Sequence, residues 1–146
     1  MIANLKNKTV VLTGAGGGIG RAIAEKLAAE QMKLILLGGN HIEKLNETAA
    51  IVNQQSSCIV MPGDLTSPEF IAESIQKIKN FTGGIDVLIN NAGVAQNTPF
   101  ENISLEEFDK IMAINVRVPF MLTQKALPML KKPPFWKQSW LRKPST

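Results

Sequence analysis

The feature that most constrains the fold is an alternation of short apolar runs with segments of helical periodicity. The runs occupy residues 8–13, 33–37, 58–61 and 85–89, and their length and composition predict buried strands. Between them, residues 19–30, 42–52 and 68–82 repeat apolar side chains every three or four positions, which predicts amphipathic helices. This order is typical of an α/β chain with right-handed crossovers. We therefore expect a three-layer, doubly wound fold around a parallel sheet.

Length and cysteine content limit the other possibilities. A chain of 146 residues forms one domain at most. Its single cysteine, Cys58, excludes internal disulfides and cysteine-rich zinc sites, and its apolar surroundings indicate a buried structural thiol. We expect no metal site. Residues 1–8 lack the apolar segment of a signal peptide, and no stretch has the length of a membrane span. We therefore expect a cytoplasmic protein with no membrane partner.

The net charge of +4 belongs to the end of the chain. Residues 131–146 hold five of the 16 Lys and Arg residues and no acid, so that 11 basic residues and 12 acidic residues remain elsewhere, a net charge of −1. We expect residues 1–131 to form the domain, with no nucleic-acid partner, and residues 132–146 to be a basic, aromatic tail outside the fold. This tail is either replaced, out-of-frame sequence or a segment that docks on a partner or an anionic surface.

A glycine-rich segment follows the first predicted strand. Residues 13–20 read Thr-Gly-Ala-Gly-Gly-Gly-Ile-Gly. A strand, a glycine turn and a helix N-terminus in succession make an anion site, because backbone N–H groups converge there. Ile19 stands where a G-x-G-x-x-G pattern from Gly14 needs its third glycine, and no Gly-Lys-Ser/Thr follows to make a P-loop. The segment is thus either a phosphate site with a different glycine pattern, G-x-x-x-G-x-G, or a flexible turn without a ligand.

The residues after the other predicted strands are also small or polar. Gly38 and Gly39 follow the second strand, Asp64 and Leu65 the third, and residues 90–93, Asn-Asn-Ala-Gly, the fourth. Ligands of parallel α/β sheets bind outside the carboxyl ends of the strands. We therefore expect these segments to meet at a ligand-binding edge.

The longest predicted helix covers residues 104–131. Ser104 and Glu107 form a capping-box pattern at its start, and apolar residues then recur at helical spacing. Pro119 lies inside this helix and predicts a lost hydrogen bond and a bend. Asn115 is an amide on the apolar face, which indicates either a structural or a functional hydrogen bond.

Four of these motifs together resemble the short-chain dehydrogenase/reductase family. They are Thr13-Gly14-x-x-x-Gly18-Ile19-Gly20, Asp64-Leu65, Asn90-Asn91-Ala92-Gly93 and Asn115-Val116. The resemblance covers about residues 5–131, roughly the N-terminal half of a usual member. It implies an incomplete Rossmann fold of about four strands and a long helix, from a truncated chain.

The resemblance also implies residue roles. Asp64 and the Leu65 backbone would hold the adenine, Thr13 would brace the turn, and Asn115 would anchor a water in the catalytic proton relay. The implied cofactor is NAD(P), and the remaining implied cofactor-binding residues are Gly14, Gly16, Gly17, Gly18, Ile19 and Gly20 for the pyrophosphate, and Asn91, Ala92 and Gly93 for the ribose.

Cofactor choice in this family depends on the end of the second strand. An acid there hydrogen-bonds the 2′-hydroxyl of NAD, whereas an arginine nearby, or a basic residue in the glycine loop, favours NADP. The corresponding residues here are Gly38, Gly39 and Gly17, which carry no charge. The missing acid favours NADP slightly over NAD. His41 is either a phosphate partner or a solvated residue at the helix start.

The catalytic groups of the family are absent. Its chemistry needs a tyrosine, a lysine four residues later and a serine, and this sequence contains no tyrosine. We expect a form of an NAD(P)-dependent oxidoreductase, acting at full length on a small carbonyl or alcohol substrate, that is inactive on its own. The alternative is a non-catalytic dinucleotide-binding or interaction module. Exposed apolar residues on the long helix, Ile111, Met112 and Phe120, predict a homo-oligomer or aggregate.

Overall fold

The structure, a computed structural model, describes residues 4–39 and 41–130. The expected tail of residues 132–146 lies outside the described residues. Four strands form one parallel sheet in the order β3-β2-β1-β4. They are β1 Thr9–Thr13, β2 Lys33–Leu37, β3 Cys58–Met61 and β4 Val87–Ile89.

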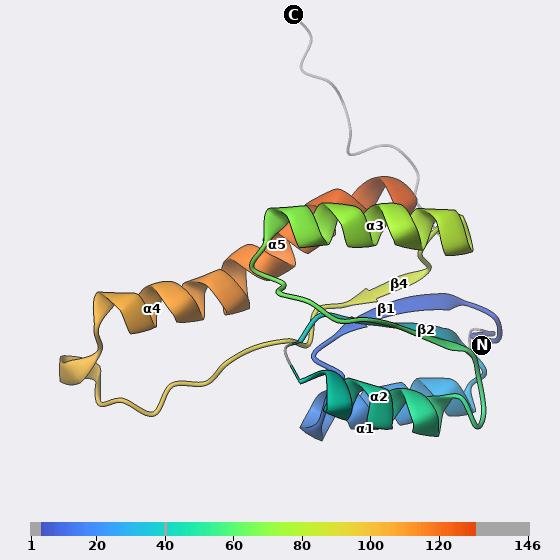
Figure 1. Ribbon diagram of the computed structural model, residues 1–146, viewed down its shortest axis with the longest axis horizontal. Helices are drawn as coiled ribbons and strands as arrows, with labels where there is room; N and C mark the ends of the chain where they lie inside the picture. Colours follow the sequence, from blue (N-terminus) through green and yellow to red (C-terminus); the bar gives the residue numbers. More distant parts are fainter. Residues whose placement is uncertain (1–3, 40, 131–146) are drawn as a thin grey trace, which may run out of the picture.

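Helices cover both faces of the sheet, so the three-layer, doubly wound fold is confirmed (Figure 1). α1 Gly18–Ala29 and α2 Ile42–Val52 pack together on one face. α3 Pro68–Thr82 and α5 Val118–Ala126 pack together on the other. α4 Leu105–Met112 lies beyond the carboxyl edge of the sheet. The connection from β4, residues 90–104, leads out to it (Figure 1).

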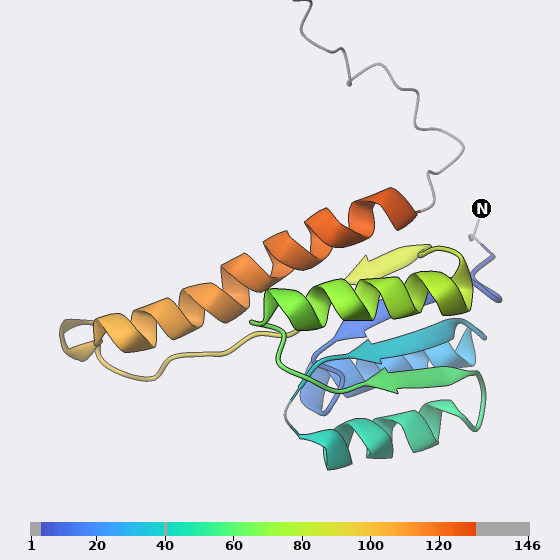
Figure 2. The ribbon, with the colours of Figure 1, turned by 45° about the horizontal axis from the view of Figure 1, so that its top comes forward.

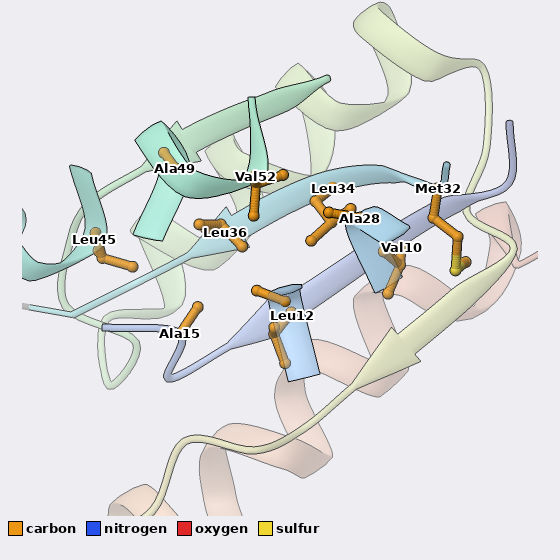
Figure 3. Close-up of a cluster of buried hydrophobic side chains, with 11 residues drawn as sticks. Val10, Leu12, Ala15, Ala28, Met32, Leu34, Leu36, Leu45, Ala49 and Val52 are labelled. Carbon is orange, nitrogen blue, oxygen red and sulfur yellow. The ribbon is translucent and has the colours of Figure 1, made fainter. Parts of the chain in front are cut away.

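Successive strand residues point to opposite faces and so supply two separate cores. Val10, Leu12, Leu34 and Leu36 belong to the core beneath α1 and α2, and Figure 3 shows these side chains beside those of Ala28, Ala49 and Val52. Val11, Ile35 and Leu37 belong to the core beneath α3 and α5. Burial on both faces explains why the strands read as unbroken apolar runs.

Turn chemistry sets the helix boundaries. Ser67 accepts a hydrogen bond from Phe70 N at 3.2 Å, and α3 ends at Gly83, whose φ of 68° is left-handed. Ser104 accepts from Glu107 N at 3.1 Å and so caps α4. The carboxylate of Glu107 does not return to Ser104 as a capping box requires; it accepts from Thr98 Oγ1 at 2.7 Å instead.

The long helix contains an unexpected wide turn. Between α4 and α5, residues Ala113–Arg117 form the π-helical segment η2, while Figure 2 shows one continuous helix across all three. Pro119 lies just after this segment, so the wide turn falls where the proline ring would crowd the preceding carbonyls. Short 3₁₀ turns flank the helix at η1 Phe100–Asn102 and η3 Leu127–Met129.

Two further observations concern the described residues. None of their helices combines the length and apolar character needed to cross a bilayer. No group of three or more metal-ligating side chains occurs among them.

Candidate functional site

The predicted site segments meet at the carboxyl edge of the sheet. The glycine loop follows β1, Gly38 and Gly39 follow β2, Asp64 and Leu65 follow β3, and residues 90–93 follow β4. Figure 1 shows these connections at the same end of the sheet, where α2 and α3 begin. The fold thus brings the four strand-end motifs together.

The glycine loop opens onto free space at the start of α1. A Cβ added at Gly17 or Gly18 would meet nothing within 4 Å, and Ile19 is 75% exposed. No side chain caps this helix. The N–H groups of its first turn lack helical partners and carry the positive end of the helix dipole. This opening therefore has the backbone chemistry that holds a phosphate.

Side chains at Gly14 and Gly20 would clash with neighbouring atoms. A Cβ on Gly20 would lie 2.1 Å from Gly14 O, and a Cβ on Gly14, whose φ is +70°, would lie 2.8 Å from Ala92 Cα. Both Cβ positions also fall within 2.9 Å of Asn91 Nδ2. The missing side chains leave room for the Asn91 amide, which donates to Thr13 O and Gly14 O, both at 3.1 Å. The Asn91 side chain thus fixes the glycine loop to the end of β4.

The side chain of Thr13 also joins the end of β1 to the residues after β4. Its buried hydroxyl accepts from Asn91 N at 3.1 Å and from Ala92 N at 3.0 Å, and contacts Ile89 O at 3.5 Å. These bonds satisfy backbone groups beyond the last ladder pair of β4. The ends of β1 and β4 are therefore joined by hydrogen bonds from both Thr13 and Asn91.

Asn115 lies in η2 and is exposed, and its side chain makes the hydrogen bonds that an amide on the apolar face was expected to need. Its Oδ1 accepts from Val94 N and its Nδ2 donates to Val94 O, both at 2.9 Å. A Cβ on Gly93 would lie 3.3 Å from Asn115 Oδ1. In this structure the amide makes a structural contact that ties the residues after β4 to the long helix.

Asp64 presents an exposed carboxylate after β3. Its Oδ1 accepts from Thr66 N and from Thr66 Oγ1, both at 2.8 Å. These hydrogen bonds stabilise the ionised form and hold the pKa of Asp64 below its usual value. Burial has the opposite effect at Cys58, where it raises the thiol pKa to about 11. Cys58 is half-buried, not fully buried as the sequence predicted, and a raised pKa favours the protonated, less nucleophilic thiol.

The end of β2 has no room for a side chain at Gly38 and strains one at Gly39. Gly38 is buried with a φ of +80°, and an added Cβ would lie 2.3 Å from Leu65 Cγ. Gly39 has a φ of +101° and donates its N–H to Gly63 O at 2.9 Å. The side chain of Leu65 thus fills the space that an acid or arginine at Gly38 would need.

A pocket of about 270 Å³ joins the glycine loop to the start of α2. Three glycine-loop residues, the two β2-end glycines and three α2-region residues line it: Gly14, Gly16, Gly17, Gly38, Gly39, His41, Lys44 and Leu45. A larger hollow of about 580 Å³ lies along α4, η2 and α5, between Asp109 and Phe120. It includes none of the predicted cofactor-binding residues, so the smaller pocket is the better candidate site.

The sequence analysis missed a polar network under the glycine loop. The fully buried Thr48 hydroxyl lies 2.8 Å from Ala15 O and accepts from Arg21 Nε at 3.1 Å. Arg21 also bonds Glu47 at 2.8 Å. The one sequence signal for this network is the position of Thr48, a polar residue on the same buried side of α2 as Leu45, Ala49 and Val52. Arg21 gives no such signal, because a charged residue on an amphipathic helix is typical of its solvent-facing side.

Comparisons with known proteins agree with this geometry. The family model for short chain dehydrogenases matches residues 8–136. An uncharacterized oxidoreductase of Staphylococcus aureus strain USA300 is 36% identical over 126 residues, which are 86% of this chain and 54% of that protein.

Solved structures give the same result. A Brucella melitensis short-chain dehydrogenase/reductase, titled glucose/ribitol dehydrogenase, has 35% identity and a TM-score of 0.80, over 90% of this chain and 54% of its own. A metagenomic short-chain oxidoreductase in complex with NADP has 31% identity and a TM-score of 0.80, over 87% and 58%. The chain thus spans about half the length of the relatives it matches. The strand-end motifs, the parallel sheet and these matches together assign the chain to the short-chain dehydrogenase family.

Proposed function

We propose that this chain binds a nicotinamide dinucleotide at the glycine loop, as part of an oxidoreductase that transfers hydride between the cofactor and an alcohol or carbonyl substrate. The observation that carries the proposal is the uncapped start of α1, where Gly17 and Gly18 leave open space. A pyrophosphate fits there because both the N–H groups and the helix dipole favour an anion. The complex of a structural neighbour with NADP supports this choice of ligand.

The remaining strand-end residues have matching roles. Gly14, Gly16 and Gly20 shape the loop, and Ile19, exposed in the first turn of α1, lies beside the bound pyrophosphate. The carboxylate of Asp64 accepts from the adenine amino group, next to the Leu65 backbone. Asn91, Ala92 and Gly93 hold the end of β4 along the ribose. Asn115 contributes by fixing the backbone of Val94.

When bound, the nicotinamide ring would supply the hydride, but this chain lacks the acid–base group of the family. The sequence has no tyrosine to exchange the hydroxyl proton. We therefore expect binding without turnover from the 146-residue chain. The second candidate function, a non-catalytic dinucleotide-binding module, is favoured by the same missing tyrosine.

Nicotinamide fluorescence tests the binding step. NADPH or NADH added to the chain should give a saturable change in fluorescence. Gly17→Val should abolish this change, because its side chain would fill the opening, while the φ of 173° at Gly17 suits any residue. Ala29→Val, at the exposed far end of α1, is the matched control and should bind normally.

A panel of carbonyl substrates then tests turnover. We expect the purified chain to oxidise neither NADPH nor NADH with any substrate of the panel. Turnover by the purified chain would overturn the proposed lack of catalysis. Failure of the folded chain to bind either dinucleotide would overturn the proposed function itself.

A further inference from the structure

The hollow along α4, η2 and α5 lies on the outer side of the long helix. Its lining comes from this helix alone and consists of Asp109, Met112, Ala113, Val116, Arg117 and Phe120. Val118 and Leu122 are buried in the core beneath α3 and α5. Phe120, two residues from each, is turned about 160° away from both, since a residue of an α-helix advances by about 100°. Figure 2 shows the α4 half of the helix projecting past the sheet.

The sequence that follows the described helix has the chemistry to cover this hollow. Residues 132–146 hold both tryptophans of the chain, four basic residues and no acid. Buried aromatic rings contribute large apolar contact areas. At the α4 end of the hollow, the sequence has four acids and one base: Glu101, Glu106, Glu107, Asp109 and Lys110. Arg117 lies farther along the hollow, so the attraction for a basic segment is directed to the α4 end.

The tail starts on the opposite side of the helix from the hollow. Ile85 N donates to Met129 O at 2.9 Å, and Leu130 forms a parallel bridge with Ile85. Val116 lies about 21 Å back along the axis from Leu130, and half the circumference of the helix adds about 16 Å crosswise, so the path is about 26 Å. Trp136, six residues after Leu130, extends about 20 Å. Trp136 therefore cannot cover the middle of the hollow in its own chain, whereas the hollow of a second copy has no such limit.

We propose that the tail of one copy, residues 132–146, docks in the hollow of a second copy. Trp136 and Trp140 pack against Val116 and Phe120, and the basic residues of the tail lie beside the acids of α4. Reciprocal docking covers the hollows of both copies and makes a closed pair. The surface is separate from the glycine loop, so this inference does not depend on nucleotide binding.

Tryptophan fluorescence reports on the tail alone, because Trp136 and Trp140 are the two tryptophans of the chain. At high protein concentration, the emission of the full chain should lie to the blue of a solvated indole, since the rings are out of water. Serial dilution should shift this emission to the red over the range in which sedimentation velocity shows smaller species. Red emission at every concentration, or blue emission that persists in a monomer, would overturn the proposal.

Variants locate the docking surface. Phe120→Arg places a charge in the hollow that repels the basic tail, and should give red emission at a concentration where the wild type emits in the blue. Phe81→Arg, on a 66% exposed phenylalanine of α3, is the matched control and should emit like the wild type. Equal emission from the two variants would place the tail elsewhere and overturn the assignment to this hollow.

Cross-linking distinguishes docking between copies from docking within one chain, also where the species do not separate on dilution. Isotopically heavy chains with p-benzoylphenylalanine in place of Trp136 are refolded together with light wild-type chains and irradiated. Mass spectrometry should find heavy tail peptides joined to light peptides from residues 109–120. Links confined to a single isotopic form, or no links to these residues, would contradict the exchange of tails.

Discussion

Thr48 shows how a single buried hydroxyl supports the candidate site. It lies on α2, yet its hydroxyl donates to a carbonyl of the glycine loop, Ala15 O, and accepts from the guanidinium Nε of Arg21. Buried polar groups that lose a partner cost more than the bond itself contributes. The loop conformation therefore depends on a residue outside every recognisable motif.

Replacing Thr48 tests this dependence. Thr48→Val keeps the shape but leaves Ala15 O and Arg21 Nε without this partner, and should lower the free energy of unfolding by about 1–3 kcal/mol. Thr48→Ser keeps the hydroxyl and should lie closer to the wild type. Urea denaturation measures both variants. A valine variant as stable as the serine variant would show that the hydroxyl is dispensable.

Gly38 gives a second prediction at the residue scale. Gly38→Ala forces a Cβ against Leu65 at a φ of +80°, and should destabilise the fold by about 2–4 kcal/mol. Gly17→Ala, where the φ is 173° and the surroundings are open, should change stability little. Thermal or urea unfolding of the two variants provides the comparison. Equal stabilities would contradict the close contact between Leu65 and the end of β2.

At the scale of elements, Asn115 joins the long helix to the residues after β4. Asn115→Ala removes both bonds to Val94 and should speed hydrogen exchange of the Val94 amide, with a loss of stability of about 1 kcal/mol. Asn80→Ala removes an exposed amide side chain from α3 and is the control; it should leave exchange of the Val94 amide unchanged. Unchanged exchange at Val94 would show that the loop is held by other contacts.

The sequence predicted some elements fully and others in part. β2, α2 and β3 have the expected bounds, because glycine or polar turns close each apolar run or helical repeat. β4 starts at Val87, two residues late, since Ile85 instead bridges Leu130 in an isolated pair. The π-helical turn η2 could not be predicted, because the apolar repeat from Phe108 to Val116 fits an ordinary helix equally well.

The parts of the candidate site that follow from local backbone pattern could be predicted from the sequence. The parts that depend on contacts between distant residues could not. The glycine loop and the residues after β3 and β4 follow from local pattern. The exclusion of a side chain at Gly38 depends on Leu65, which is 27 residues away, and the role of Thr48 depends on the approach of α2 to the loop. Contacts of this kind leave no periodic signal in a sequence.

At the scale of the whole molecule, α4, η2 and α5 expose a large apolar face. Met112 and Phe120 are exposed as predicted, whereas Ile111 is half-buried. Leu105, Phe108 and Val116 extend the face. Contiguous apolar surface of this kind promotes association in water.

We predict that the isolated chain is oligomeric or aggregated. Val116→Glu with Phe120→Glu should shift it toward smaller species, because both side chains lie on this face. Phe81→Glu, on a 66% exposed phenylalanine of α3, is the matched control. Sedimentation velocity measures the distribution. A stable wild-type monomer with a cooperative melt would count against the prediction.

The central claim is that the opening at the start of α1 binds a nicotinamide dinucleotide, and backbone amide chemical shifts test it most directly. On saturation with NADPH, the largest shifts should fall on Gly17, Gly18 and Ile19, with smaller ones at Asp64 and the residues after β4. The amide chemical shifts of residues that line the hollow along α4 and α5 should not change. Shifts confined to that hollow, or no shifts at the glycine loop, would contradict the account.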